Sequence, residues 1–266
     1  MPDLRKRKFK LLRKRAPKPL PPTGAQVAYL AELKAMMAYA RELVRERVKA
    51  RLPVLLGQVN VDAPDPYNRV NKLLDSVSEA FFKRYPNERL VKLASKIARL
   101  TSEHQKTQLF RQIKSTIGID LKTIADKGMS ERIKRFTAEN VALIKTVPQK
   151  YFDDVEKTVL AGVRDGARAS EIASDLEERA GVAESRSALI ARDQVLKFNG
   201  ELNKVRQQDL GIDSYVWRTV KDNRVRDEHA ELDGETFSWD DPPEPGHPGE
   251  DFQCRCYSEP VMPGEE

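Results

Sequence analysis

Two histidines and two cysteines near the C-terminus could bind a metal ion. Residues 217–260 hold both cysteines of the chain and two of its three histidines. Thiolate sulfur and imidazole nitrogen are the usual ligands of Zn²⁺, which structural sites hold in a tetrahedron of four such atoms. We therefore predict a structural Zn²⁺ site, whose candidate ligands are His229, His247, Cys254 and Cys256.

The spacing of the two cysteines favours a metal over a disulfide. Side chains two apart on a strand point to the same face, but their Cα atoms lie roughly 7 Å apart, at the limit that a disulfide can bridge. A bound ion needs no such close approach, and it would stabilise a small unit with little apolar core. The alternative is that both cysteines are ordinary buried residues beside Trp217 and Trp239. In that case a neighbouring carboxylate holds His229.

Carboxylates in the same stretch allow a catalytic interpretation. A metal-dependent nuclease uses a histidine as general base and carboxylates to hold Mg²⁺; the residues available for this are Asp222, His229, Asp240 and Asp241. Asp240 and Asp241 directly precede two prolines, where they more simply begin a turn. The chain also contains no G-x-S-x-G, Walker or H-E-x-x-H pattern. We therefore expect no enzymatic activity.

The elements that must position these side chains are short. Alternating and β-branched or aromatic residues predict three strands, over residues 214–220, 236–239 and 254–257. A short helix is expected over residues 224–232. The segment 240–251 contains four prolines, which fix the backbone torsion φ and make this loop rigid. The sequence thus predicts a small α+β module.

The rest of the chain is predicted to be helical. Apolar residues recur at steps of three and four, and prolines or glycines end each run. The expected helices cover residues 25–52, 70–82, 90–117, 130–145, 149–168, 170–181 and 185–209. In this interpretation Pro148 and Gly181 each separate two helices. The fold class is mainly α, a multi-helix body with a small β-rich C-terminal module and a disordered basic N-terminal tail.

We expect this chain to divide into four parts along the sequence. They are a flexible tail rich in basic residues and proline (1–24), a helical N-terminal domain (25–147), a helical segment leading into the C-terminal module (148–210), and the α+β module itself (211–266).

The basic character of the chain comes from its first residues. The whole chain has a formal charge of +6, but residues 1–22 carry nine Lys/Arg and one Asp, which is +8 and leaves −2 for the remainder. Such a segment is expected to be mobile, and it suits phosphate contacts with DNA or an acidic protein surface; the alternative is a solvated tail. The candidate binding residues are Arg5, Lys6, Arg7, Lys8, Lys10, Arg13, Lys14, Arg15 and Lys18.

Composition excludes several classes of protein. No apolar run approaches the roughly 20 residues needed to cross a bilayer, so we expect no membrane partner. No apolar segment follows the basic start, as one would in a secretory signal. Two cysteines in 266 residues do not make a disulfide framework. A cytosolic setting is expected.

The order of residues in the C-terminal stretch resembles a known family. The pattern W-R-T-x-x-D-x-R-V-R-x-x-H-x-x-L-D-G, followed by an H-P-G loop and C-R-C-x-x-x-P, is similar to the C-terminal domain of phage Mu F-like minor head proteins, also called phage head morphogenesis proteins. Residues 185–200 resemble the helix before that domain. The resemblance covers about residues 130–260, whereas residues 1–129 match only in being helical.

This resemblance implies a minor capsid protein that helps to assemble the head of a tailed phage. It implies a place inside the head near the portal vertex, and in the host cytoplasm during assembly. The partners it implies are the portal protein and the major capsid or scaffolding protein, with DNA as a further partner of the tail. Some family members have a cysteine where this chain has Arg226, which cannot bind a metal. The alternative function is a metal-dependent nuclease or DNA-binding factor that uses the C-terminal His/Cys module.

Overall fold

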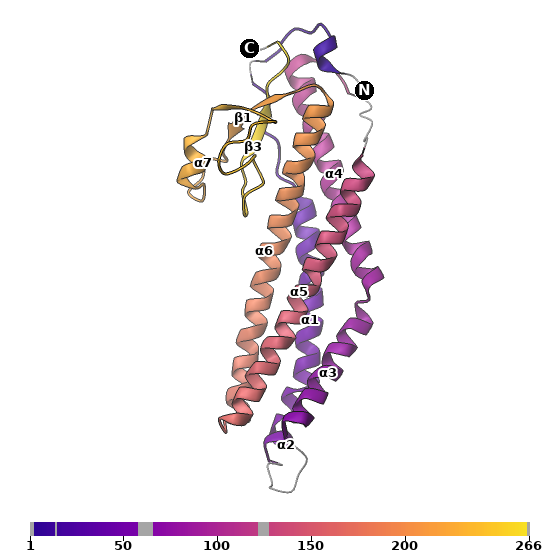
Figure 1. Cartoon of the computed structure of the whole chain (residues 1–266), viewed down its shortest axis with the longest axis vertical. Helices are drawn as coiled ribbons and strands as arrows, with labels where there is room; N and C mark the ends of the chain where they lie inside the picture. The colour runs from indigo at the N-terminus through magenta and orange to yellow at the C-terminus, as the bar shows by residue number, and fades with distance from the viewer. Residues whose placement is uncertain (1–2, 14, 58–65, 122–127, 265–266) are drawn as a thin grey trace. The chain divides into compact units, whose positions relative to one another are not determined.

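The computed structural model describes residues 3–13, 15–57, 66–121 and 128–264 (Figure 1). Most of these residues are helical, and a small antiparallel sheet lies near the C-terminus, which confirms the predicted mainly α protein with a β-rich C-terminal module. No helix in these ranges is long and apolar enough to span a membrane. The helices are α1 (Thr23–Arg47), α2 (Leu52–Gly57), α3 (Pro66–Arg84), α4 (Asn87–Ile117), α5 (Met129–Arg164), α6 (Ala169–Asp209) and α7 (Asp227–Glu231), with 3₁₀ turns η1 (Leu4–Lys6) and η2 (Lys49–Arg51).

The predicted helix break at Pro148 is wrong. Pro148 lies inside α5, which continues through it. A proline in a helix removes one backbone hydrogen bond and costs roughly 3 kcal/mol. Buried side chains on both sides, Ile144 and Tyr151 among them, are 0% and 2% exposed and hold the helix in the core. Burial of the apolar face therefore outweighs the local preference of proline.

The predicted break at Gly181 is also wrong, because α6 is one helix from Ala169 to Asp209. Its neighbours Ala180 and Ala183 are buried, and a single glycine inside a helix costs only about 1 kcal/mol. Helix α5 ends at Arg164, a few residues before the expected end at 168, and Gly166 just beyond it has φ +66°. The next helix starts where the Glu171 carboxylate accepts a hydrogen bond from the Arg168 backbone N–H at 2.9 Å.

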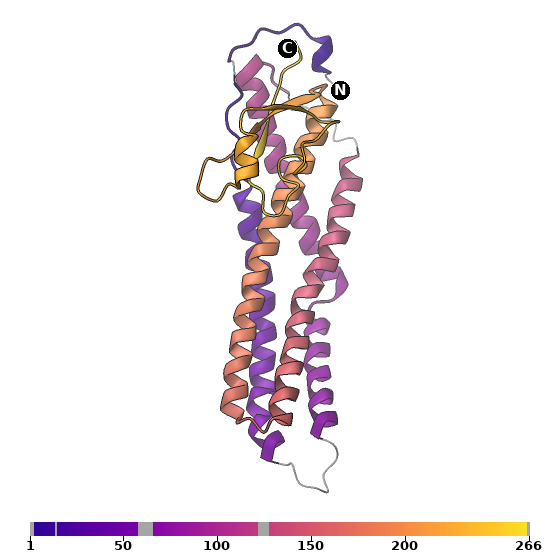
Figure 2. The same ribbon diagram turned by 60° about the vertical axis from the view of Figure 1, so that its left-hand side comes forward.

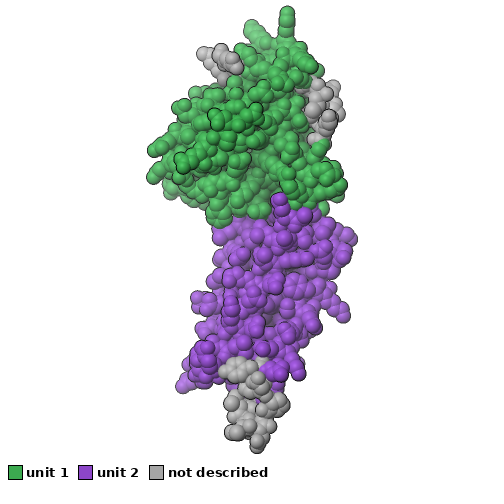
Figure 3. Space-filling view, viewed as in Figure 1, with its two compact units in different colours: residues 1–27, 95–136, 192–266 green, residues 28–94, 137–191 purple. Residues whose placement is uncertain are grey.

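The chain forms two compact units, each built from segments that are distant in sequence (Figure 3). Unit 1 comprises residues 1–27, 95–136 and 192–266, and unit 2 comprises residues 28–94 and 137–191. Residue 147, where the sequence suggested a domain boundary, lies inside α5.

Unit 2 is a helical unit with an aromatic core. Phe81 is fully buried, and its ring lies 5.0 Å from Tyr85 and 5.4 Å from Phe152, measured between centroids. The buried hydroxyl of Tyr29 donates a hydrogen bond to the Asn140 side-chain oxygen at 2.9 Å. These contacts join α1, α3 and α5.

Unit 1 holds the sheet, and a buried polar layer holds its helices together. The guanidinium of Arg206 in α6 is 1% exposed and donates to the Ser102 carbonyl at 2.8 Å and to the Gln105 side-chain oxygen at 2.6 Å in α4. One residue later, the Gln207 side-chain oxygen accepts a hydrogen bond from the Trp239 indole N–H at 3.1 Å. The C-terminal part of α6 thus carries polar contacts to both α4 and the module.

The sheet has the order β2-β1-β3, with both pairings antiparallel. Its strands are β1 (Ser214–Arg218), β2 (Thr236–Ser238) and β3 (Tyr257–Pro260). It lies beside the C-terminal part of α6 in both views (Figures 1 and 2). The first two predicted strands are confirmed. The third is wrong in position, because β1 pairs with residues 257–260 and leaves Cys254 and Cys256 in the loop before β3.

The N-terminal segment, of which residues 3–13 and 15–22 are described, runs along α4, and η1 is the one helical turn in these described residues. Leu4 is fully buried, and its backbone N–H donates to the Leu210 carbonyl at 2.9 Å. Farther along, the Leu12 N–H donates to the Thr116 carbonyl at 2.7 Å, and the Gln112 amide donates to the Pro17 carbonyl at 3.1 Å. The mobility of this segment stays a prediction; the structure identifies the contacts that movement would break.

Candidate metal centre

Three of the four predicted metal ligands lie together in unit 1. His229 is in α7, and Cys254 and Cys256 are in the loop that precedes β3. The His229 Nδ1 atom lies 3.7 Å from the Cys254 sulfur and 3.6 Å from the Cys256 sulfur. His229 and Cys254 are 2% and 4% exposed, and Cys256 is partly buried. Among the described residues these three form a group whose ligand atoms all lie within 4.8 Å of one another.

Two ion pairs hold the loop that carries the cysteines. The Arg255 guanidinium makes two hydrogen bonds to the Asp222 carboxylate, at 2.5 and 2.6 Å, and this pairing lowers the pKa of Asp222 to about 2. Before the cysteines, Asp251 accepts a hydrogen bond from Arg226 at 2.5 Å. The Arg226 guanidinium also donates to the Phe252 carbonyl at 2.7 Å. The loop is therefore bound at two points, before the cysteines and between them, to the segment that leads from β1 into α7.

The second ring nitrogen of His229 faces a carboxylate. Its Nε2 atom lies 3.4 Å from the Asp251 side-chain oxygen, on the opposite side of the ring from the two sulfurs. The ring also contacts Trp217 edge to face, with centroids 5.4 Å apart. A neutral ring that carries its proton on Nε2 would leave Nδ1 free to accept or to bind a metal ion.

The two thiols affect each other's ionisation. Hydrogen bonding from the Cys256 thiol lowers the pKa of Cys254 to about 6. The same interaction raises the pKa of Cys256, because the thiol that donates the proton is the one that keeps it. One of the two sulfurs is thus disposed to be a thiolate near neutral pH, and a metal ion would displace the remaining proton.

The fourth predicted ligand, His247, lies elsewhere in the module. Its Nε2 is 3.0 Å from the Lys204 ammonium and its Nδ1 is 2.9 Å from the Tyr215 hydroxyl. An ammonium can only donate, so Nε2 accepts and the proton of the neutral ring is on Nδ1. Burial, followed by the nearby Lys204 charge, lowers the pKa of His247 and favours this neutral form. Both ring nitrogens are therefore engaged, and the structure does not bring His247 to the other three ligands.

The carboxylates considered for a nuclease do not converge with His229. Asp222 is paired with Arg255, while Asp240 accepts from the Gln208 amide at 3.4 Å. Asp241 forms an isolated backbone bridge with Ser238. Within the described ranges, the second group of candidate metal ligands is Glu228, His229 and Asp251, which uses none of these three aspartates.

The part of the chain that contains the candidate site is similar to a known protein family. Residues 153–259 match the model of the family described as Phage Mu protein F like protein. This region is Mu F-like. The matched region includes all three clustered candidate ligands, His229, Cys254 and Cys256. It also includes all of β1, β2 and α7.

The chain also has a relative of unassigned function. It is 31% identical over 198 residues to an uncharacterized protein from Haemophilus influenzae, an alignment that covers 73% of this chain and 44% of the relative. The chain therefore spans less than half of that relative's length. No solved structure is significantly similar to this chain.

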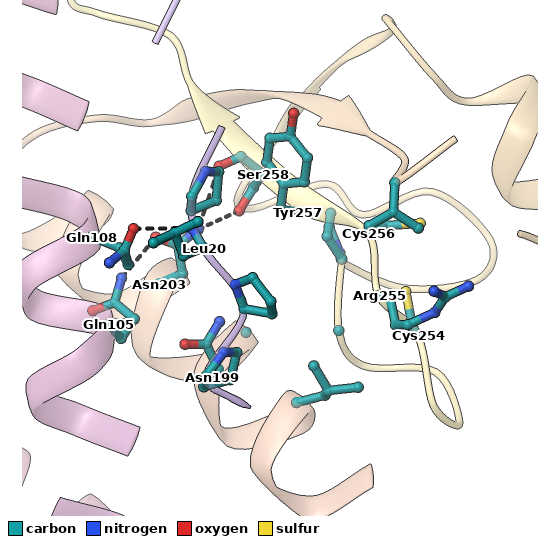
Figure 4. Close-up of a pocket in the computed structure, with 18 of the residues that line it drawn as sticks. Leu20, Gln105, Gln108, Asn199, Asn203, Cys254, Arg255, Cys256, Tyr257 and Ser258 are labelled. Atoms are coloured by element: carbon teal, nitrogen blue, oxygen red, sulfur yellow. Dashed lines mark hydrogen bonds between the residues drawn. The ribbon is translucent and has the colours of Figure 1, made fainter. Parts of the chain in front are cut away.

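The Mu F-like region borders two cavities of unit 1. A small one of about 130 Å³ is lined by the three candidate ligands and by Arg192, Arg224, Arg226 and Arg255. A larger one of about 370 Å³ lies between the N-terminal segment, α4, α6 and the cysteine loop. Figure 4 shows Cys254, Arg255 and Cys256 on one side of it and Gln105, Gln108, Asn203 and Leu20 on the other.

The basic residues of the N-terminal segment are exposed. This holds for Arg5, Lys6, Arg7, Lys8, Lys10, Arg13, Arg15 and Lys18, while Lys14 lies outside the described residues. Arg5 differs from the others because it pairs with Asp3 at 3.0 Å and lies 3.5 Å from Asp213.

Sequence reasoning missed the residues that support the site. Asp251 was read only as part of the proline-rich loop, and Arg226 only as a residue that cannot bind a metal. Their pairing joins positions 25 residues apart, and it depends on how the loop folds back. The one available signal was the pair of oppositely charged residues, each three residues from a candidate ligand, at 226 and 251.

Proposed function

We propose that this protein is a minor capsid protein that acts in head morphogenesis of a tailed phage. The observation that carries the proposal is the match of residues 153–259 to the Mu F-like family. The proposed location is the inside of the head near the portal vertex. The proposed partners are the portal protein and the major capsid or scaffolding protein.

The fold is consistent with a role in binding rather than catalysis. In unit 1, the buried polar layer around Arg206 joins α6 to α4. Of the candidate nuclease residues, Asp222 is paired with Arg255, Asp240 accepts from Gln208, and Asp241 lies in a backbone bridge with Ser238. A Mu F-like structural protein without enzymatic activity accounts for these features.

Deletion of the gene tests this proposal directly. In the phage or prophage that carries it, deletion is expected to yield defective or empty heads, with a large loss of infectious particles. Electron microscopy and plaque titre measure the two effects, and expression of the intact chain from a plasmid is the control that should restore both. Normal yields of DNA-filled, infectious particles after deletion would contradict the proposal. Recovery of the chain with purified portal rings or particles would support the proposed partners.

The exposed basic residues are proposed to contact DNA. Replacing Lys6, Arg7, Lys8, Lys10 and Arg13 with glutamine is expected to weaken binding to duplex DNA and to flatten its salt dependence. Each lost phosphate contact lowers the slope of log K against log salt by about 0.9, so loss of most of the five contacts changes it by roughly 3 to 4. Fluorescence anisotropy with labelled duplex at several salt concentrations measures both effects.

Substitution suits this measurement better than truncation, because removing the whole segment would also take Leu4 out of a buried apolar cluster. A control variant with the same change in charge replaces five exposed lysines of the helices with glutamine, namely Lys72, Lys83, Lys92, Lys134 and Lys150. An equal effect of the two variants would show that the N-terminal segment has no special part in DNA binding.

A further inference from the structure

We propose that His229, Cys254 and Cys256 bind one Zn²⁺ ion, and that its fourth coordination position opens into the small arginine-lined cavity. The His229 ligand atom is Nδ1. His247 takes no part, so the site differs from the four-residue set that the sequence suggested. The chemistry of this site is independent of the proposed role in head assembly.

The distances between the ligand atoms fit a tetrahedral ion. Zinc binds sulfur at about 2.3 Å and imidazole nitrogen at about 2.0–2.1 Å, which places a sulfur and a nitrogen of one tetrahedron roughly 3.6 Å apart. The observed separations from Nδ1 to the two sulfurs are 3.7 and 3.6 Å. Both nitrogen–sulfur separations therefore match those of ligands on one tetrahedral ion.

The surroundings of His229 orient it as a metal ligand. Metal-bound histidines usually donate their other ring N–H to a carboxylate or carbonyl, which fixes the ring and makes it a better ligand. Asp251 lies 3.4 Å from Nε2, and Arg226 holds that carboxylate at 2.5 Å. Arg226 thus acts on the site through Asp251.

The fourth position follows from the cavity. Three protein ligands leave one corner of the tetrahedron open, as in zinc sites that keep a water molecule or an exchangeable ligand. All three ligands line the cavity of about 130 Å³, together with Arg192, Arg224, Arg226 and Arg255. Because these side chains are cationic, the open position favours water or a small anion over a cation.

Metal analysis of the intact protein tests this site. Protein purified without chelators is expected to contain close to one zinc ion per chain by elemental analysis, and His229→Gln or Cys254→Ser should reduce this to near zero. His247→Gln is the matched control, because it changes a buried histidine of the same module and should retain zinc. Zinc-free wild-type protein that also fails to take up added Zn²⁺ under reducing conditions would overturn the proposal. Equal loss of zinc from His247→Gln and His229→Gln would overturn the three-ligand assignment.

Two measurements on the wild-type chain avoid reliance on variants that fold poorly. Replacing zinc with Co²⁺ is expected to produce an intense thiolate-to-metal absorption band, and adding azide should shift the visible Co²⁺ bands if the fourth position is open. Both cysteines should resist a thiol reagent until a chelator is added, and these are the only two thiols in the chain. Absence of the thiolate band would overturn the site, and a spectrum unchanged by saturating azide would overturn the open position.

Discussion

Replacing Trp217 with alanine is expected to lower the free energy of unfolding of unit 1 by about 3–5 kcal/mol. The Trp217 side chain is 0% exposed and packs in the core of the module with Tyr215 and Trp239. Its removal deletes a large buried apolar side chain and leaves a cavity beside His229, whose ring it contacts. Urea denaturation followed by the fluorescence of the remaining Trp239 measures the change.

Phe252→Ala is the matched control for this substitution. Phe252 lies in the same module but is 53% exposed, and its loss should change the free energy of unfolding by less than about 0.5 kcal/mol. A loss below about 1 kcal/mol for Trp217→Ala would show that the module contributes little to the stability of unit 1.

Substitution by alanine at two glycines of α6 is expected to change the free energy of unfolding in opposite directions. A Cβ atom at Gly200 would lie 2.7 Å from the Pro248 carbonyl oxygen and 3.3 Å from the Gly249 Cα. Both are backbone atoms and cannot rotate away, so Gly200→Ala should cost about 1–3 kcal/mol. At Gly181 nothing lies within 4 Å of the added atom, and the higher helix propensity of alanine should stabilise the protein by up to about 1 kcal/mol.

The two glycine variants need different probes. Both tryptophans, Trp217 and Trp239, lie in unit 1 with Gly200, so their fluorescence reports on Gly200→Ala. Gly181 is in unit 2, where far-ultraviolet circular dichroism at the helix signal is the suitable measurement. A stabilising Gly200→Ala would mean that the loop at 246–249 does not rest on α6 as the structure has it.

Much of the fold could be predicted from sequence because it depends on local periodicity. The apolar repeat identified α4 as a single helix, and alternation identified β1. Predictions failed where distant packing outweighs a local preference: at Pro148, where buried neighbours hold α5 together, and at Gly181, where α6 continues. The position of β3 was missed because its register is determined by pairing with β1, from Arg218 with Tyr257 to Tyr215 with Pro260.

The candidate site was predictable only in part, for a similar reason. The chemistry of His229, Cys254 and Cys256 follows from residue type, and the structure brings these three together. Residue type could not show that the ring nitrogens of His247 are hydrogen-bonded to Lys204 and Tyr215. Lys204 belongs to α6, 43 positions away in the sequence. Nor could it reveal the role of Asp251, which depends on the path of the loop.

The anchoring of the N-terminal segment affects how its charges can be used. The Leu4 backbone N–H donates a hydrogen bond to the Leu210 carbonyl, and the Ala16 N–H donates to the Glu259 carboxylate at 3.0 Å. The described basic residues between these two points lie in a segment that contacts the rest of unit 1 at both ends. A loop already restrained at both ends loses less conformational entropy when it binds a polyanion. The reach of such a segment is correspondingly short, so the proposed binding of DNA would take place at the surface of unit 1.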